Sequence, residues 1–288
     1  MRGLSRSHAA ITIVNALPTG VGAAVGIDLT VTARATVAPA ERAALAVDPP
    51  DSATPVVREA VREALGLEAR SPARTIHLAI ASEIPPAVGL KSSSAVASAV
   101  VGAVAAAIGE RPGPEAVARL AAAASRRAGV SATGAFDDAL AGVSAGVVVT
   151  DNARDALLRR WPVGPGLGVV LWVPDGRHPP APELHERFRR YAADARRAAD
   201  AATAGRCWEA MRLNTELVDA VMGYDRRELA RRLRAHGAVA TGTSGLGPAL
   251  AAVGPRERLS ELAAELRGAP GTVREVAFAA PAATEGGP

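Results

Sequence analysis

The clearest pattern in the chain is a strict alternation of apolar and polar side chains from residue 28 to residue 37. Leu29, Val31 and Ala33 fall on one side of an extended backbone, and the threonines between them fall on the other. This period of two predicts a β-strand with one buried face. Shorter apolar or alternating runs predict further strands over residues 8–16, 76–80, 146–150, 169–173 and 273–278, and a strand–glycine loop–strand unit within 236–253.

Helical spacing of apolar residues marks the segments between these strands. Together with a long run of small apolar residues after the serines at 92–94, it predicts helices over residues 54–67, 92–109, 114–128, 182–202, 207–222 and 226–234, a short helix after the acidic residues at 137–138, and another from 255. Because the strands and helices follow no regular βαβ repeat, they favour an α+β protein. The length of 288 residues suits two domains, which we expect at 1–157 and 158–288.

Residues 85–109 (PPAVGLKSSSAVASAVVGAVAAAIG) combine a rigid entry, a glycine turn and three serines ahead of a long apolar helix. Gly89 permits backbone conformations that other residues resist, and the serines stand where a helix leaves its first N–H groups unpaired. A helix N-terminus of this kind favours phosphate. Lys91 is the only lysine in the chain, and it is either a phosphate ligand or an ordinary surface lysine.

An acidic pair, Asp137 and Asp138, and two further glycine-rich loops, residues 17–26 and 244–247, are the other features that can form a site. Acids at the start of a helix also serve as caps, so the pair alone does not establish catalysis. The chain has neither a G-x-x-x-x-G-K-[ST] loop nor a protein-kinase catalytic loop. The single cysteine, Cys207, excludes an internal disulfide. No metal-ligand spacing is visible among the five histidines, His8, His77, His178, His185 and His236.

The net charge of +4 comes from 33 basic and 29 acidic residues that are largely interleaved at helical spacing. This favours solvated helix faces over a nucleic-acid surface, because no aromatic residues stand between the basic ones. No apolar stretch approaches the roughly 20 residues of a membrane span. We therefore expect a cytoplasmic protein without a nucleic-acid or membrane partner, and we leave a homo-oligomer open.

The motifs resemble those of the GHMP small-molecule kinases. PPAVGLKSS resembles their second motif, P-x-x-x-G-L-x-S-S, TSGLGPALAAV resembles their glycine-rich third motif, and GID at residues 26–28 stands at the place of the first. Within that superfamily, GAAVGIDL, GLKSSS, TGAFDDA and GVVVTDN are similar to the archaeal-type shikimate kinases, in the same order along nearly the whole chain. The resemblance implies an N-terminal domain like domain 2 of ribosomal protein S5 and a ferredoxin-like C-terminal domain.

The resemblance also implies ATP- and Mg²⁺-dependent phosphorylation of a small-molecule hydroxyl, and it carries roles onto individual residues. The implied catalytic residues are Asp137, which meets the attacking hydroxyl, and Lys91, which neutralises charge on the transferred phosphoryl group. The implied ATP-binding residues are Pro85, Gly89, Leu90, Lys91, Ser92, Ser93, Ser94, Gly245 and Gly247, with Ser93 touching Mg²⁺. The implied substrate-binding residues are Asn15, Asp28, Thr133, Asp137, Asp138 and Ser244.

Several alternatives stay open from the sequence. Shikimate, giving shikimate 3-phosphate for aromatic amino-acid synthesis, is the favoured substrate, and a cyclitol, homoserine or mevalonate is the alternative within the same superfamily. A nucleotide- or RNA-binding module is the non-enzymatic alternative. Asp138 is the alternative base to Asp137, and the arginine that would meet a substrate carboxylate is not identified. The helix before the acidic pair ends without a carboxylate, so Mg²⁺ would be held by water, phosphate and serine.

Overall fold

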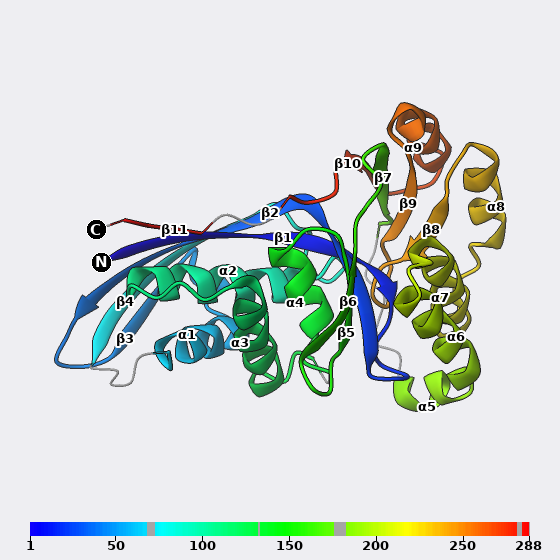
Figure 1. The fold of residues 1–288 in the computed structure, drawn as a ribbon. Helices are drawn as coiled ribbons and strands as arrows, with labels where there is room; N and C mark the ends of the chain where they lie inside the picture. Colours follow the sequence, from blue (N-terminus) through cyan, green and yellow to red (C-terminus); the bar gives the residue numbers. More distant parts are fainter. Residues whose placement is uncertain (68–72, 132, 176–182, 281–283, 288) are drawn as a thin grey trace.

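The computed structural model describes residues 1–67, 73–131, 133–175, 183–280 and 284–287. These residues form two β-sheets with helices packed against them, and the first and last strands lie side by side at one end of the molecule (Figure 1). The sheets belong to an α+β architecture, as the sequence predicted.

The larger sheet is built around two long strands that pair along most of their length. Its strands are β1 (Arg2–Val14), β2 (Val21–Pro39), β3 (Ala44–Asp48), β4 (Arg74–Ser82), β5 (Val147–Asp151), β6 (Ala156–Trp161) and β11 (Thr284–Gly287). The order is β11-β1-β2-β4-β3, and β2 also pairs with β5, which pairs with β6. Strand β2 reaches both β4 and β5 because its C-terminal half pairs with the first and its N-terminal half with the second.

The alternation at residues 28–37 is confirmed, since Leu29, Val31 and Ala33 are buried within β2. The glycine-rich loop expected over residues 17–26 is wrong for its second half, where residues 21–26 continue β2. Gly22 and Gly26 serve close packing here, because a Cβ at either position would collide with Asp137 or with the backbone of Ala141. Glycine at these two positions therefore reflects the approach of a helix and not a turn.

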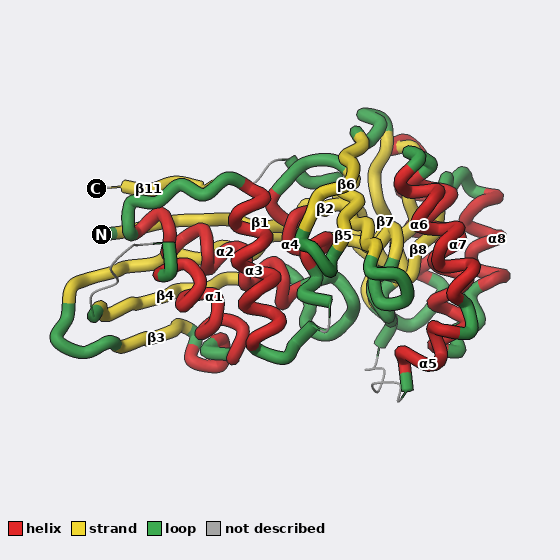
Figure 2. Tube along the Cα trace, turned by 60° about the horizontal axis from the view of Figure 1, so that its bottom comes forward, coloured by secondary structure: helices red, strands yellow, loops and turns green. Residues whose placement is uncertain are grey.

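Helices α1 (Pro55–Leu65), α2 (Ser92–Ala107), α3 (Pro114–Arg127) and α4 (Phe136–Val143) cover one face of the larger sheet (Figure 2). Thirteen residues of α2 are buried, all of them alanine, valine, serine or glycine. Such small side chains let the helix lie between the sheet and its neighbours without voids. This central position holds the N-terminus of α2 in a fixed place.

The smaller sheet contains β7 (Leu167–Val173), β8 (Ala240–Thr243), β9 (Leu250–Pro255) and β10 (Thr272–Val276) in the antiparallel order β10-β7-β9-β8. Its helices are α5 (Leu184–Arg189), α6 (Ala192–Thr203), α7 (Cys207–Met222), α8 (Arg227–Ala235) and α9 (Leu259–Arg267). The succession strand, helices, two strands, helix, strand is the ferredoxin-like arrangement. It matches the expectation for the C-terminal part of the chain.

The differences from the predicted elements are local. The helix expected over residues 182–202 is two helices, α5 and α6, separated near Tyr191, while residue 182 and His178 lie outside the described residues. Strands β3, β6 and β11 have no counterpart among the predictions. Strand β6 belongs to the larger sheet and ends at Trp161, and β11 returns to that sheet from the end of the chain. The division after residue 157 stays a prediction.

Across the part of the chain that the structure describes, no helix is both long enough and apolar enough to cross a bilayer.

Candidate active site

A cavity of about 610 Å³ lies where the N-terminal ends of α2 and α4 face the segment 244–249 between β8 and β9. It is lined by residues far apart in the sequence, from the end of β1 to the segment between β8 and β9. The sequence-predicted site residues that line it are Asn15, Gly89, Leu90, Lys91, Ser92, Ser93, Ser94, Thr133, Asp137, Asp138, Gly245 and Gly247. The structure therefore brings together the serine loop, the acidic pair and the third glycine loop.

Three predicted residues do not line this cavity. The Asp28 side chain is 61% exposed, and it lies 3.8 Å from the His8 ring on β1. Pro85 precedes the loop without reaching the cavity wall. Ser244 is buried behind the loop, where its hydroxyl donates a 2.8 Å hydrogen bond to the carbonyl of Gly89. Their placement lends no support to direct ligand binding by these three side chains.

The loop before α2 has an unusual backbone. Ala87, Gly89 and Lys91 all have positive φ, at 60°, 90° and 64°. A residue with a Cβ in this left-handed region costs roughly 1–2 kcal/mol, so the conformation persists only where surrounding contacts require it. Lys91 is the residue immediately before the first helical residue, Ser92, and its side chain gives the helix no cap. The helix N-terminus thus opens into the cavity with no side-chain cap, as an anion site needs.

The third glycine loop holds the loop before α2 in that conformation. Ala249 donates a backbone hydrogen bond of 3.0 Å to the carbonyl of Val88, and Ser244 bonds Gly89 from the other side. A Cβ on Gly89 would overlap the carbonyl oxygen of Ser244. Gly245 in turn donates 2.8 Å from its N–H to the Thr12 hydroxyl on β1. The two loops are therefore one unit, anchored to the larger sheet.

Asp137 lies in the first turn of α4 and is 4% exposed. Asn152, just after β5, donates a 2.7 Å hydrogen bond from Nδ2 to Oδ1 of this carboxylate. The Oδ1 of Asn152 accepts bonds from the Asp137 backbone N–H and, at 2.7 Å, from the Thr150 hydroxyl. Gly22 leaves the space that the second carboxylate oxygen occupies. The carboxylate is thus held in one orientation at the cavity wall.

Asp138 forms an ion pair with Lys91, in which Nζ lies 3.1 Å from Oδ1, and both side chains are largely buried. Burial, reinforced by the neighbouring charge of Asp137, raises the pKa of Asp138 to about 7 against the opposing effect of Lys91. Oδ1 accepts no well-aligned hydrogen bond from any described residue, so the ion pair is its main interaction. Lys91, the last residue of the loop before α2, is therefore held at the acidic pair by its ion pair with Asp138.

The cavity has few side chains that could bind a metal ion and few that could bind a substrate carboxylate. Within the described ranges, no three His, Cys, Asp or Glu side chains stand close enough to hold a metal ion. The end of α3 contributes Ser125 to the wall, whereas Arg126 turns away to pair with Asp155. No arginine is among the described lining residues, and Lys91 is their one basic side chain.

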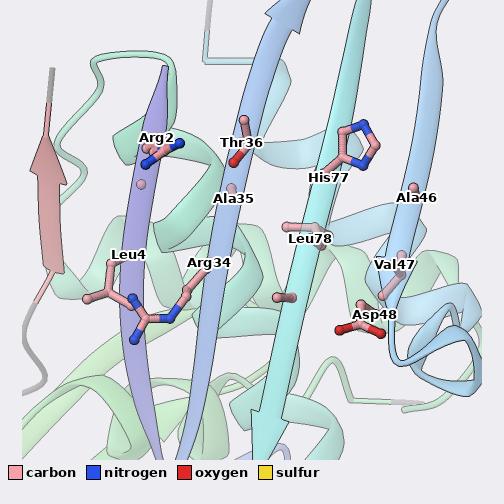
Figure 3. Close-up of a pocket in the computed structure, with 12 residues that line it drawn as sticks. Arg2, Leu4, Arg34, Ala35, Thr36, Ala46, Val47, Asp48, His77 and Leu78 are labelled. Atoms are coloured by element: carbon pink, nitrogen blue, oxygen red, sulfur yellow. The ribbon is translucent and has the colours of Figure 1, made fainter.

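A separate cavity of about 570 Å³ lies on the face of the larger sheet opposite its helices, over β1, β2, β4 and β3 (Figure 3). Arg2, Arg34, Asp48 and His77 contribute to its walls. None of the sequence-predicted site residues lines it. The cavity at the helix N-termini is therefore the candidate active site.

Sequence reasoning gave no role to three residues that shape this site, namely Thr12, Gly22 and Asn152. Asn152 and Gly22 belong to GVVVTDN and GAAVGIDL, two of the segments that resemble the archaeal-type shikimate kinases, and this is the visible signal for them. Thr12 carries no local signal, because its importance arises from its contact with Gly245, which is distant in the sequence.

Comparisons with known proteins agree with this geometry. Residues 54–146 match the family model of the GHMP kinases N terminal domain. The chain is 36% identical over 279 residues to a shikimate kinase of Halobacterium salinarum, covering 96% of each protein. It is 35% identical over 269 residues to a shikimate kinase of Pyrococcus furiosus, covering 91% of this chain and 95% of that one. A homoserine kinase structure from Cytophaga hutchinsonii superposes with a TM-score of 0.73 at 15% identity, over 99% of this chain and 97% of that one.

Proposed function

Because the chain belongs to the family of these archaeal shikimate kinases, with a GHMP kinase N-terminal domain, we propose that it transfers the γ-phosphoryl group of ATP to a hydroxyl of shikimate. The observation that carries the proposal is the meeting of two features across one cavity. An uncapped helix N-terminus that suits phosphate faces a buried, oriented carboxylate that suits a hydroxyl.

The loop before α2 and the N-terminus of α2 are the proposed seat of the ATP phosphates. Backbone N–H groups from Gly89 to Ser92 and the helix dipole would hold them, and Gly245 and Gly247 form the facing wall. Lys91 adds a positive charge where negative charge develops as the phosphoryl group moves. Because Lys91 is paired with Asp138, its ammonium is held near the cavity and not in bulk solvent.

Asp137 is the proposed partner of the substrate hydroxyl. Asn152 donates to one carboxylate oxygen, which leaves the other to accept the hydroxyl proton and aim its oxygen at the phosphorus. Phosphoryl transfer depends mainly on positioning and charge neutralisation, so orientation of the alcohol contributes as much as deprotonation. Asn15, Thr133 and Asp138 are proposed to surround the substrate.

Mg²⁺ is the metal that a kinase of this family implies, and the donor set present fits a loosely held ion. Ser93 supplies a hydroxyl at the start of α2, and the Asp138 carboxylate, which is paired with Lys91, lines the same cavity. Mg²⁺ characteristically keeps several waters and binds substrate phosphates through few protein ligands. When bound, it supplies charge neutralisation on the β- and γ-phosphates.

An ATP-coupled assay over a panel of alcohols tests the proposal. Shikimate, a cyclitol, homoserine and mevalonate are each supplied with ATP and Mg²⁺, and ADP release is measured together with the mass of the phosphorylated product. We expect turnover with shikimate to exceed that with every other alcohol. Turnover with another alcohol of the panel, and none with shikimate, would overturn shikimate as the substrate but would still support a kinase activity.

Two variants separate catalysis from folding in that assay. Asp137→Asn keeps the size of the side chain and should lose turnover, whereas Asp51→Asn changes the same charge at an exposed position outside the cavity and should not. ATP-independent, salt-sensitive RNA binding without turnover of any alcohol would instead support a nucleic-acid-binding module.

A further inference from the structure

A third cavity, of about 460 Å³, lies between α7 and α8 at the start of β8, and none of the described residues lines both this cavity and the candidate active site. Among the described residues, four arginines line it: Arg212, Arg226, Arg227 and Arg234. The acidic lining residues are Glu216 and Asp219. The formal charge of the walls is therefore positive, with an excess of two.

The protein itself neutralises these positive charges only in part. Among the described residues, no carboxylate lies within ion-pair distance of Arg212, Arg227 or Arg234, all of which are exposed. Arg226 is 8% exposed and forms no ion pair with a described residue either. Burial lowers its pKa, with Asp219 compensating only in part. A buried guanidinium without a carboxylate partner is costly, and an anion in the cavity would relieve that cost.

Arg226 also connects this cavity to the third glycine loop. Its guanidinium donates to the Pro248 carbonyl at 2.6 Å and to the Thr243 hydroxyl at 2.9 Å. It stacks on the ring of Tyr224 at 4.1 Å, and the Tyr224 hydroxyl donates to the Leu246 carbonyl at 2.8 Å. Residues 245–247 of the same loop line the active-site cavity. Arg226 and Tyr224, which line the arginine cavity, are therefore hydrogen-bonded to a segment that lines the active site.

We propose that the arginine-lined cavity between α7 and α8 binds a small dianion, a phosphate ester or a dicarboxylate, and that its occupancy changes nucleotide binding through residues 243–248. An arginine guanidinium can donate two parallel hydrogen bonds to the oxygens of a phosphate or a carboxylate. The cavity volume is within the range of small-molecule binding sites. An anion that draws on Arg226 competes with its bonds to Thr243 and Pro248, which position the loop. The proposed anion site does not depend on the proposed function, whereas the proposed effect on nucleotide binding rests on the proposed function.

Calorimetric titration with inorganic phosphate, and separately with succinate, tests the site. The full chain is first saturated with Mg²⁺ and a non-hydrolysable ATP analogue, so that the phosphate loop is filled; the heat of that step shows independently whether nucleotide binds. We expect one further site for at least one of the two dianions. Binding of phosphate alone would assign a phosphate ester, and binding of succinate alone a dicarboxylate.

Variants locate that site. The double variant Arg212→Ala/Arg234→Ala removes two exposed cations and should weaken the dianion at least tenfold. Arg196→Ala, at an exposed arginine of α6 outside the cavity, is the matched control and should leave affinity unchanged. Glu216→Gln raises the positive charge of the cavity and should tighten binding several-fold, which keeps the test valid if the double variant is unstable. Equal affinity in all these proteins, or no further site, would overturn the proposal.

The link to the active site has its own readout. The dianion that binds should change KM for ATP at least twofold in the unaltered chain and leave it unchanged in the double variant. A bound dianion with the same KM in both would retain the site and overturn the coupling. Absence of phosphoryl transfer to any alcohol would refute the proposed function while the titration still decides the site.

Discussion

The buried carboxyl of Asp138 should make the stability of this protein depend on pH in a way that one substitution removes. Its pKa is raised from 3.8 to about 7, so the folded chain binds this proton more tightly than the unfolded chain does. The associated stability is fully present below pH 4 and is lost as the pH rises toward 7. The folded pKa of about 7 lies about two units above pH 5, and each unit corresponds to about 1.4 kcal/mol. The free energy of unfolding should therefore fall by about 3 kcal/mol between pH 5 and pH 8.

Asp138→Asn cannot titrate and should not show this loss. Urea unfolding at pH 5, 6, 7 and 8, followed by the fluorescence of the three tryptophans, gives the free energy of unfolding of each protein. The unaltered chain should lose about 3 kcal/mol relative to the variant across that range, whatever their difference at pH 5. Because both proteins are measured at the same pH values, the contributions of the other titrating groups cancel in the difference between their free energies of unfolding.

Glu257→Gln is the matched control, since it removes one carboxylate at an exposed position far from the cavity and should keep the pH dependence of the unaltered chain. A stability difference between the unaltered chain and Asp138→Asn that stays constant from pH 5 to pH 8 would refute the reasoning. It would mean that Lys91 compensates the buried charge of Asp138 fully.

Three further substitutions test the proposed roles. Asp137→Asn should lower turnover with shikimate by about 10²–10⁴-fold and leave the unfolding midpoint nearly unchanged, and near-normal turnover would exclude it as the hydroxyl partner. Lys91→Met should lower kcat by about 10²–10³-fold, measured at saturating ATP; an effect on KM alone would point to ground-state binding instead. Gly89→Ala adds a Cβ that overlaps the Ser244 carbonyl at a φ of 90°, so it should cost about 2 kcal/mol of stability and raise KM for ATP, and a normal KM would contradict the role of this loop.

Much of the fold could be predicted because it depends on local patterns. Strand β2 and helix α7 (Cys207–Met222) carry their own periodicity, and α2 is marked by a long run of small apolar residues. Strands β3, β6 and β11 could not be predicted, because each is short and pairs with a partner that other segments supply. Gly22 and Gly26 predict a loop but lie in β2, since close helix packing and a turn both select glycine.

The site divides in the same way. The sequence by itself determined the chemistry available, namely a serine-rich helix N-terminus, a solitary lysine and an acidic pair, because these depend on residue type and short spacing. Only the tertiary structure decided that Lys91 pairs with Asp138, that Asn152 orients Asp137, and that Asp28 lies outside the cavity. These outcomes depend on contacts between segments 15 to more than 40 residues apart, and local pattern carries no information about which distant backbones will meet.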